Sequence, residues 1–210
     1  MSDASTLTLS KSQRLVKRIF DLVFGFVFLV ATSPLMVVIG VLIKINSPGP
    51  VIFRQKRVGE KGIIFDMFKF RTMIDGAETK IHLVEKTDED GNYYFKFPQD
   101  PRITLIGRFL RRTSLDELPQ IFNVLKGDMS MVGPRPEMPF LVEKYQTWQN
   151  ARFNVPQGLT GWWQINGRSD KPMHFNTRDD IYYIENYSFI LDIKILIRTI
   201  FVVIFGKGAY

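Results

Sequence analysis

The longest apolar stretch of the chain lies near its N-terminus. Residues 22–43 read LVFGFVFLVATSPLMVVIGVLI, with no charged side chain among twenty-two residues. As a helix, a stretch of this length rises about 33 Å, enough to cross the roughly 30 Å apolar core of a bilayer. The stretch is too long for the core of a cleaved secretory signal, and no small-residue cleavage site follows it. The pattern therefore predicts a helix embedded in a membrane.

The middle of this stretch holds a dipeptide that favours a break in the helix. Ser33-Pro34 divides it into halves of 11 and 9 residues, and a proline inside a helix removes one backbone hydrogen bond, leaving a carbonyl that the serine hydroxyl can satisfy. Basic residues, which mark the cytoplasmic side of a membrane, stand on both sides of the stretch: Lys11, Arg14, Lys17, Arg18, Lys44, Arg54, Lys56 and Arg57. A helix-break-helix that enters and leaves on one face keeps both groups with anionic lipid. We therefore favour this re-entrant hairpin over a kinked single-pass helix.

Shorter segments follow a turn-rich linker at residues 46–50. Residues 51–53 and 63–70 are apolar and aromatic runs on either side of a glycine-bounded turn at 59–62. This arrangement predicts a β-hairpin. Residues 103–110 predict a short helix that delivers basic residues to its end.

A second apolar stretch, residues 190–205, is interrupted by Asp192, Lys194 and Arg198. These charges argue against a second spanning helix. An amphipathic helix lying in the membrane interface fits better, with Trp162-Trp163 and the nearby tyrosines as headgroup-level anchors. A core helix of a globular part is the competing interpretation.

Together these patterns predict a helix-rich α+β fold with a re-entrant helix-break-helix, a small β-hairpin and interfacial amphipathic helices. Its parts are a flexible N-terminus (1–13), the re-entrant membrane hairpin (14–45) and a domain on the cytosolic face (46–210) that ends in the interfacial helix. Residues 75–100 are polar and locally acidic, which is typical of a mobile loop or an insert. The histidines, His82 and His174, have no second metal ligand beside them and are interpreted as surface residues.

The composition narrows the classes of partner. The chain has 210 residues, a formal net charge of +7 and no cysteine. The lack of cysteine excludes disulfides and thiolate metal sites. The positive charge favours an anionic partner, which could be a phospholipid surface, a phosphorylated substrate or a nucleic acid.

The stretch RRTSLDELPQ places two neighbouring carboxylates, Asp116 and Glu117, after Arg111 and Arg112. One interpretation is an ordinary helix start in which Ser114 and Glu117 form a capping box. The other is a cationic pocket that holds an anionic nucleophile. In both, the carboxylates lie in the first turn of a helix, where unpaired amides and the helix dipole stabilise anions. We therefore expect the carboxylates to stay ionised at neutral pH.

Further cations are candidates for phosphate contacts. Lys69 and Arg71 share one face of the second predicted strand, and Arg135 lies between two prolines in the stretch KGDMSMVGPRP. Rigid loops that fix one cation are common at phosphate sites. A solvated strand face and a structural corner are the competing interpretations. Asp180 is a further candidate polar contact, or an ordinary helix-start residue.

Several motifs together carry a resemblance to one family. They are NSPGPVIFRQKRVG, FKFRTM, RRTSLDELPQIFNVLKGDMSMVGPRPE, GLTGWWQINGR and DIYYIENYSFILDIKIL. With them the chain resembles, from about Arg14 to Tyr210, the small form of the bacterial sugar transferases, the monotopic polyprenyl-phosphate phosphoglycosyltransferases. The sequence Val155-Pro-Gln-Gly158 departs from the family's usual Pro-Gly, so nucleotide or sugar contacts in that loop do not carry over.

The resemblance implies an enzyme that moves a sugar 1-phosphate from a UDP-sugar to undecaprenyl phosphate and releases UMP, which initiates exopolysaccharide, O-antigen or glycoprotein glycan synthesis. It implies that Asp116 is the nucleophile of a covalent phosphosugar intermediate, that Glu117 is catalytic beside it, and that both hold Mg²⁺. Ser33-Pro34 would be the membrane break. The predicted substrate contacts are Lys69, Arg71, Arg111, Arg112, Arg135 and Asp180.

The resemblance also implies a place and partners. The protein is expected at the bacterial inner (cytoplasmic) membrane, with its catalytic domain on the cytoplasmic face. The expected partners are a UDP-hexose, undecaprenyl phosphate and an anionic bilayer, and no nucleic acid; the oligomeric state is open, a homo-oligomer included. The residues alone leave two alternatives, which are a membrane-bound diphosphate hydrolase and a basic peripheral membrane protein without enzymatic activity.

Overall fold

The computed structural model describes residues 7–77, 79, 86–87, 93–94, 100–167 and 176–204. His82, His174 and most of the predicted loop 75–100 lie outside these residues. The described chain is α+β and rich in helix, as predicted. Its elements are α1 (Lys11–Asn46), β1 (Ile52–Val58), η2 (Glu60–Gly62), β2 (Ile64–Phe70), β3 (Lys86–Thr87), β4 (Tyr93–Tyr94), α2 (Leu105–Thr113), η4 (Leu115–Glu117), α3 (Gln120–Lys126), β5 (Ser130–Val132), α4 (Pro139–Val142), η5 (Thr147–Asn154), β6 (Gly158–Thr160), α5 (Trp162–Ile165), α6 (Arg178–Glu185) and α7 (Phe189–Ile204).

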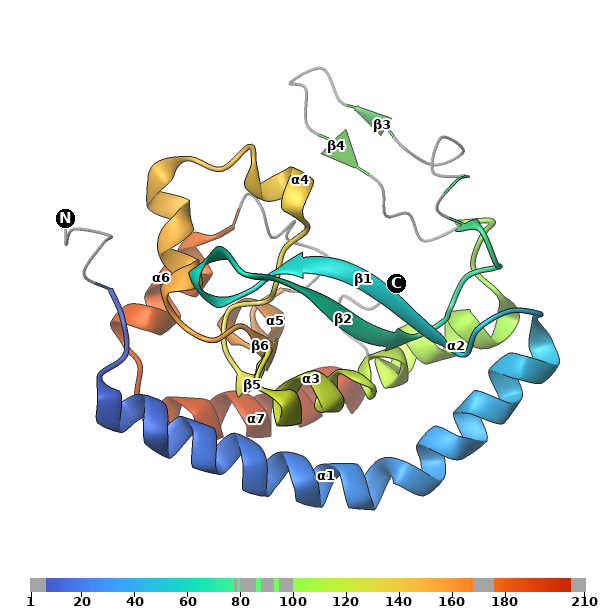
Figure 1. Cartoon of the computed structure of the whole chain (residues 1–210), viewed down its shortest axis with the longest axis horizontal. Coiled ribbons are helices and arrows are strands. Elements are labelled where there is room, and N and C mark those ends of the chain that lie inside the picture. The colour runs from blue at the N-terminus through green and yellow to red at the C-terminus, as the bar shows by residue number, and fades with distance from the viewer. Residues whose placement is uncertain are drawn as a thin grey trace.

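The predicted β-hairpin is confirmed. Strands β1 and β2 pair antiparallel, from Ile52 opposite Phe70 to Val58 opposite Ile64. Strands β5 and β6 pair in parallel, and β3 pairs with β4. Figure 1 shows α1 along one edge of the molecule, with α3 and α7 between it and the hairpin. The predicted short helix is also present, as α2, which extends to Thr113.

Helix α1 begins at Lys11, earlier than the predicted boundary at residue 14. The reason is a capping box that the sequence analysis did not consider. The amide of Gln13 donates to Ser10 Oγ at 3.2 Å, and the amide of Ser10 donates to Gln13 Oε1 at 2.8 Å. Leu9, just before the cap, is buried in the main core.

The helix continues without interruption through Ser33-Pro34, so the predicted helix-break-helix is one bent helix. Figure 1 shows its change of direction. Pro34 cannot donate to the carbonyl of Val30, and Ser33 Oγ donates to that carbonyl instead, at 3.0 Å. The predicted use of the serine hydroxyl is therefore confirmed. The re-entrant course through a membrane stays a prediction.

The two halves of α1 pack on different apolar clusters. Phe20 and Phe28 of the first half contact the main core, whose fully buried members include Ile121, Val124 and Ile195. The second half buries Ile39 and Ile43 against a smaller cluster with Phe70 and Leu110. Since each half follows its own cluster, the bend near Pro34 allows both to be buried.

The other side of α1 is apolar and exposed, and its exposed side chains include Val23, Phe26, Val27, Val37, Val41 and Ile45. Of the helices in the described ranges, α1 is the one whose length and composition would allow it to cross a membrane. Large exposed apolar surfaces of this kind mark contact with lipid or protein.

Helix α7 has features of both predicted alternatives for the C-terminal stretch, a core helix and an amphipathic helix. Ile195 and Asp192 are buried in the core, as expected of a core helix. Ile190, Ile197, Ile200 and Phe201 are exposed, as expected of an amphipathic helix. Its position in a membrane interface stays a prediction.

Candidate active site

The two neighbouring carboxylates lie in the short turn η4, between α2 and α3. Ser114 ends α2 in the left-handed conformation (φ 58°, ψ 14°) and forms no side-chain cap hydrogen bond. Helix α3 begins only at Gln120, after Pro119. The capping-box interpretation is therefore wrong. The pair does lie in the first turn of a helix, as predicted, but this helix is the three-residue 3₁₀ helix η4 and not the start of an α-helix. Neighbouring side chains supply the positive charge instead.

Glu117 is held by two cations. Lys69 Nζ donates to its Oε1 at 2.8 Å, and Arg135 donates to Oε1 at 2.5 Å and to Oε2 at 3.3 Å. Burial alone would raise the pKa of Glu117, but Arg135 and Lys69 outweigh it and hold the pKa well below its usual range. Glu117 is therefore an ionised carboxylate with both oxygens engaged.

Asp116 lies beside this cluster but is not held in the same way. Its side chain is 11% exposed, and Lys69 Nζ lies 3.9 Å from Oδ2. No residue of the described ranges donates a hydrogen bond to its carboxylate. Burial raises the pKa of Asp116, Lys69 lowers it, Glu117 raises it, and Arg111 and Arg135 lower it. The pKa of Asp116 is therefore raised, although the helix-terminal amides and the neighbouring arginines were expected to favour its ionised form.

Of the other predicted substrate contacts, only Arg111 acts directly on the carboxylate pair. Arg111 Nε donates to Thr72 Oγ1 at 2.9 Å, and its charge acts on Asp116. Arg112, the next residue, is exposed, because adjacent helical side chains point about 100° apart. Arg71 follows β2 and donates to the carbonyls of Ser47 and Pro48. It thus fastens the end of α1 to the hairpin.

Asp180 takes part through a chain of buried contacts. Arg152, which is fully buried, forms an ion pair with Asp180 Oδ2 at 2.7 Å. The same guanidinium donates to the backbone carbonyl of Arg135 at 2.6 Å and to the Tyr145 hydroxyl at 2.9 Å. Asp180 and Arg152 therefore fix the backbone from which Arg135 reaches Glu117.

Sequence reasoning missed Arg152 and a second buried pair, Arg57 and Glu137, whose Nη1 and Oε1 atoms are 3.5 Å apart. Burial lowers the pKa of Arg57 to about 10, against the opposing effect of Glu137. Neither pair has a signal in the sequence, because the partners are far apart in the chain. A glycine is required in the loop that carries Arg135. A Cβ on Gly133 would lie 2.3 Å from the carbonyl oxygen of Pro156, so only glycine allows this loop to pack there.

The fold and the site together define a class of protein. An apolar helix that can enter a membrane adjoins a buried carboxylate pair among lysine and arginine, which are features of a membrane-associated enzyme with an anionic substrate. Sequence comparison gives the family. The chain matches the family described as bacterial sugar transferase over residues 12–206 and belongs to it.

Individual relatives agree with this assignment. The chain is 40% identical over 204 residues to the undecaprenyl-phosphate galactose phosphotransferase of Salmonella typhimurium, covering 95% of this chain and 43% of that protein. It is 40% identical over 216 residues to the undecaprenyl-phosphate glucose phosphotransferase of Komagataeibacter xylinus, covering 96% and 38%. It is 35% identical over 198 residues to the exopolysaccharide production protein ExoY of Sinorhizobium fredii, covering 92% and 88%. The chain thus spans less than half the length of the first two relatives.

Proposed function

We propose that this protein transfers a sugar 1-phosphate from a UDP-sugar to undecaprenyl phosphate, through a covalent intermediate on Asp116, and releases UMP. The reaction would initiate the assembly of a polysaccharide. The observation that carries the proposal is the unequal state of the two carboxylates. Glu117 is bonded through both oxygens, whereas Asp116 is buried beside cations and accepts no hydrogen bond from the described residues.

The first step is attack by an Asp116 oxygen on the sugar-side phosphorus of the UDP-sugar. A P–O bond to Asp116 forms, the bond to the bridging oxygen breaks, and UMP leaves with the electron pair. In the second step a phosphate oxygen of undecaprenyl phosphate attacks the same phosphorus. The bond to Asp116 breaks, and the carboxylate is regenerated.

Electrostatics explains why the cations are needed. A carboxylate and a diphosphate a few ångströms apart repel by several kcal/mol at an effective dielectric constant of about 20. Lys69, Arg111 and Arg135 lie around the pair and would offset this repulsion. The raised pKa of Asp116 means a more basic, and therefore more nucleophilic, carboxylate once it is ionised. Glu117 would act by holding Lys69 and Arg135 in place.

The residues fit Mg²⁺ only in part. Within the described ranges there is no group of three or more histidine, aspartate or glutamate side chains that could hold a metal. Mg²⁺ is usually bound by one or two carboxylates together with water and substrate phosphates, so Asp116 with a diphosphate would be sufficient. The oxygens of Glu117 already accept from Lys69 and Arg135, which makes Glu117 the poorer of the two predicted ligands. Bound there, Mg²⁺ would neutralise charge on the diphosphate.

The donor and the membrane arrangement are part of the same proposal. Two of the relatives are named as galactose and glucose phosphotransferases, so UDP-galactose and UDP-glucose are the first donors to test. A helix α1 that enters and leaves on the cytoplasmic face of the inner membrane would hold the site at the level of the lipid phosphate, where a cytosolic UDP-sugar can reach it.

A donor assay tests the chemistry. The purified protein is incubated with each radiolabelled UDP-sugar and Mg²⁺, first without and then with undecaprenyl phosphate. We expect about one equivalent of UMP and a phosphosugar adduct on the Asp116 peptide without acceptor, and lipid-linked sugar with it. Continuous release of free sugar phosphate without acceptor would indicate the hydrolase, and an adduct on another residue would refute the mechanism.

A labelling experiment tests the topology. The natural chain has no cysteine, so a single cysteine at residue 3 can be probed with an impermeant thiol reagent in oriented vesicles. The re-entrant arrangement requires this cysteine to be labelled from the same side as one placed in the domain that follows α1. Labelling from the opposite side would show a spanning helix.

A further inference from the structure

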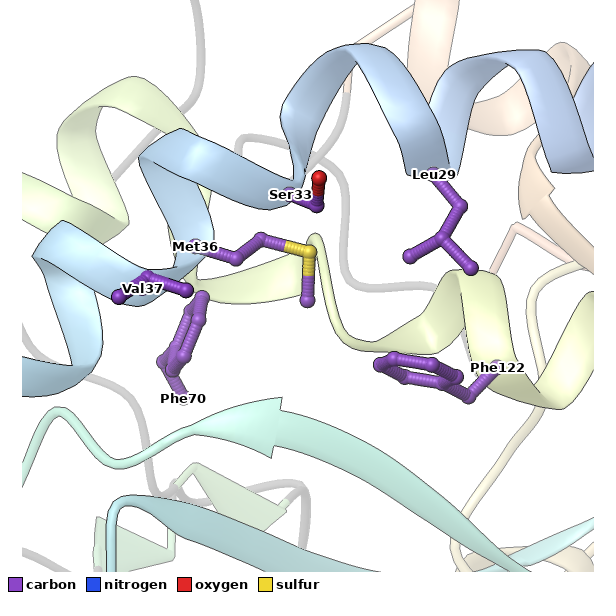
Figure 2. Close-up of a pocket in the computed structure, with 6 residues that line it drawn as sticks. All are labelled: Leu29, Ser33, Met36, Val37, Phe70 and Phe122. Atoms are coloured by element: carbon purple, nitrogen blue, oxygen red, sulfur yellow. The ribbon is translucent and has the colours of Figure 1, made fainter.

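An apolar pocket lies under the bend of α1. It has a volume of about 260 Å³ and is lined by Leu29, Ser33, Met36 and Val37 of α1, Phe70 of β2 and Phe122 of α3. Figure 2 shows Met36 and Leu29 extending from α1 toward Phe70 and Phe122. The Ser33 hydroxyl already donates to the Val30 carbonyl. The lining therefore presents almost only carbon and sulfur to a ligand.

The pocket adjoins the turn that carries the carboxylates. Met36 and Phe70 pack in the same apolar cluster as Leu115 and Leu118, the residues on either side of the Asp116-Glu117 pair. The turn η4 thus presents leucines to the pocket side and carboxylates to the cationic side. A ligand in the pocket would be separated from Asp116 by the thickness of one turn of chain.

The pocket opens onto surface that is already apolar. Val37 and Phe122 are 67% and 45% exposed, and they continue the exposed apolar side of α1. The other side of the turn, where the carboxylates lie, carries the positive charges of Lys69, Arg111 and Arg135. A ligand that matches both parts has an apolar chain and a phosphate at one end.

We propose that this pocket seats the first isoprene units of the polyprenyl phosphate acceptor, with the chain passing around η4 so that its phosphate reaches Asp116. This inference rests on the proposed function. The size agrees: a cavity of about 150 Å³ holds the six carbons of benzene, so about 260 Å³ holds roughly ten carbons, or two isoprene units. The UDP-sugar has no apolar part of this size, so charge and polarity assign the pocket to the acceptor.

Two adjacent valines provide a matched test. Val37 lines the pocket, whereas Val38 is exposed and does not line it. In Val37→Trp the indole ring would occupy part of the pocket, and we expect the KM for undecaprenyl phosphate in mixed micelles to rise roughly tenfold, equivalent to about 1.4 kcal/mol. UMP release in the absence of acceptor should not change. Val38→Trp should leave both quantities within about twofold of the unmodified protein.

The outcomes separate the two proposals. If the unmodified protein releases no UMP, the proposed function fails. If it transfers sugar but the KM is unchanged in Val37→Trp, or rises equally in both variants, the pocket inference is overturned and the function stands. An equal rise would mean that a bulky group disturbs the membrane helix in general.

Photo-crosslinking gives a second, independent measurement. A polyprenyl phosphate with a diazirine in its second isoprene unit should label peptides that contain Leu29 or Phe122. Excess undecaprenyl phosphate should suppress the labelling, and excess phosphatidylglycerol should not. Suppression by phosphatidylglycerol would show that an acyl chain of the bilayer fills the pocket, which overturns the assignment.

Discussion

Two buried ionic clusters of this protein each place a lysine beside an aspartate, and they differ in how their carboxylates are hydrogen-bonded. The anchor cluster joins Lys17 of α1, Asp192 of α7 and Tyr183 of α6. Asp192 accepts from Lys17 at 2.7 Å through Oδ2 and from Tyr183 at 2.7 Å through Oδ1. The candidate-site cluster comprises Lys69, Asp116, Glu117 and Arg135. There Glu117 accepts hydrogen bonds through both oxygens, and Asp116 accepts none from the residues that the structure describes.

The difference is the one expected between a carboxylate with a structural role and one with the proposed chemical role. A buried carboxylate without hydrogen bonds loses the free energy of hydration and gains little in return. The anchor cluster avoids this loss and ties α1 to the domain. The candidate-site cluster tolerates this loss at one residue, Asp116, which leaves its oxygens available for the proposed bond to phosphorus. Perturbed carboxylates of this kind concentrate at functional sites.

The largest expected effect comes from removing the unbonded carboxylate. Asp116→Asn keeps the size of the side chain and removes the proposed nucleophile, so sugar transfer should fall by at least about 10³-fold. The control is Asp66→Asn, since Asp66 lies in an exposed pair with Lys56 and its loss should not change the rate. Both variants should keep the melting temperature and membrane association of the unmodified protein. Retained turnover in Asp116→Asn would remove the distinction between the two clusters.

Substitutions in the anchor cluster should lower the stability of the fold and leave the chemistry of sugar transfer unchanged. Lys17→Met leaves the buried charge of Asp192 without its cation, which costs about 3–5 kcal/mol, or roughly 6–20 °C in melting temperature. Adding Asp192→Asn should recover part of this loss, because the unpaired charge is gone. Thermal unfolding in detergent measures both. A Lys17→Met protein as stable as the unmodified one would show that the pair is not needed to hold α1.

Asp180 is intermediate between the two clusters, because one of its carboxylate oxygens is paired and the other is not. The dependence of stability on pH tests this description. Its Oδ2 is paired with Arg152, while no described residue donates to its Oδ1, and burial raises its pKa to about 6, against the opposing effect of Arg152. The unfolded value is about 3.9, so the folded state binds more protons between these pH values. The stability contributed by the protonated group is therefore present below pH of about 4 and lost as pH rises through about 6.

The measurement is the melting temperature of the unmodified protein minus that of Asp180→Asn, followed across this pH window. The difference should fall as the pH rises, which corresponds to a loss of up to about 3 kcal/mol in the free energy of unfolding for a shift of two pKa units. A difference that stays constant would mean that Arg152 keeps Asp180 ionised throughout.

Glu117→Gln should have the smallest effect. Glutamine can still accept a hydrogen bond from Lys69 or Arg135 but loses its charge, so we expect a fall in kcat/KM of about tenfold, near the lower value for a charged hydrogen bond. Because the charge of Glu117 raises the pKa of Asp116, the acid limb of the pH profile should also move to lower pH. Glu60→Gln, at a partly exposed pair with Arg14, is the control. An unmoved acid limb would show that Glu117 does not act on Asp116.

The local features could be predicted because their causes lie within a few residues. The β-hairpin follows from apolar runs around a glycine turn, and the link from Ser33 Oγ to the Val30 carbonyl follows from the position of Pro34. The capping box at Ser114 was wrong for a tertiary reason. Packing of α2, η4 and α3 against β2 holds Ser114 in the left-handed conformation, so its side chain cannot cap.

Residue types and their order along the chain were enough to give the apolar helix, the helix-rich α+β class and the candidate pair, Asp116 and Glu117. Tertiary structure decided which carboxylate is bonded and which is open. Four separate segments of the chain bring together Lys69, Arg135, Arg152 and Asp180. No short-range sequence pattern predicts that these residues are close in space. Hydrogen bonding and burial depend on distances of a few ångströms between such segments, and only the folded chain sets those distances.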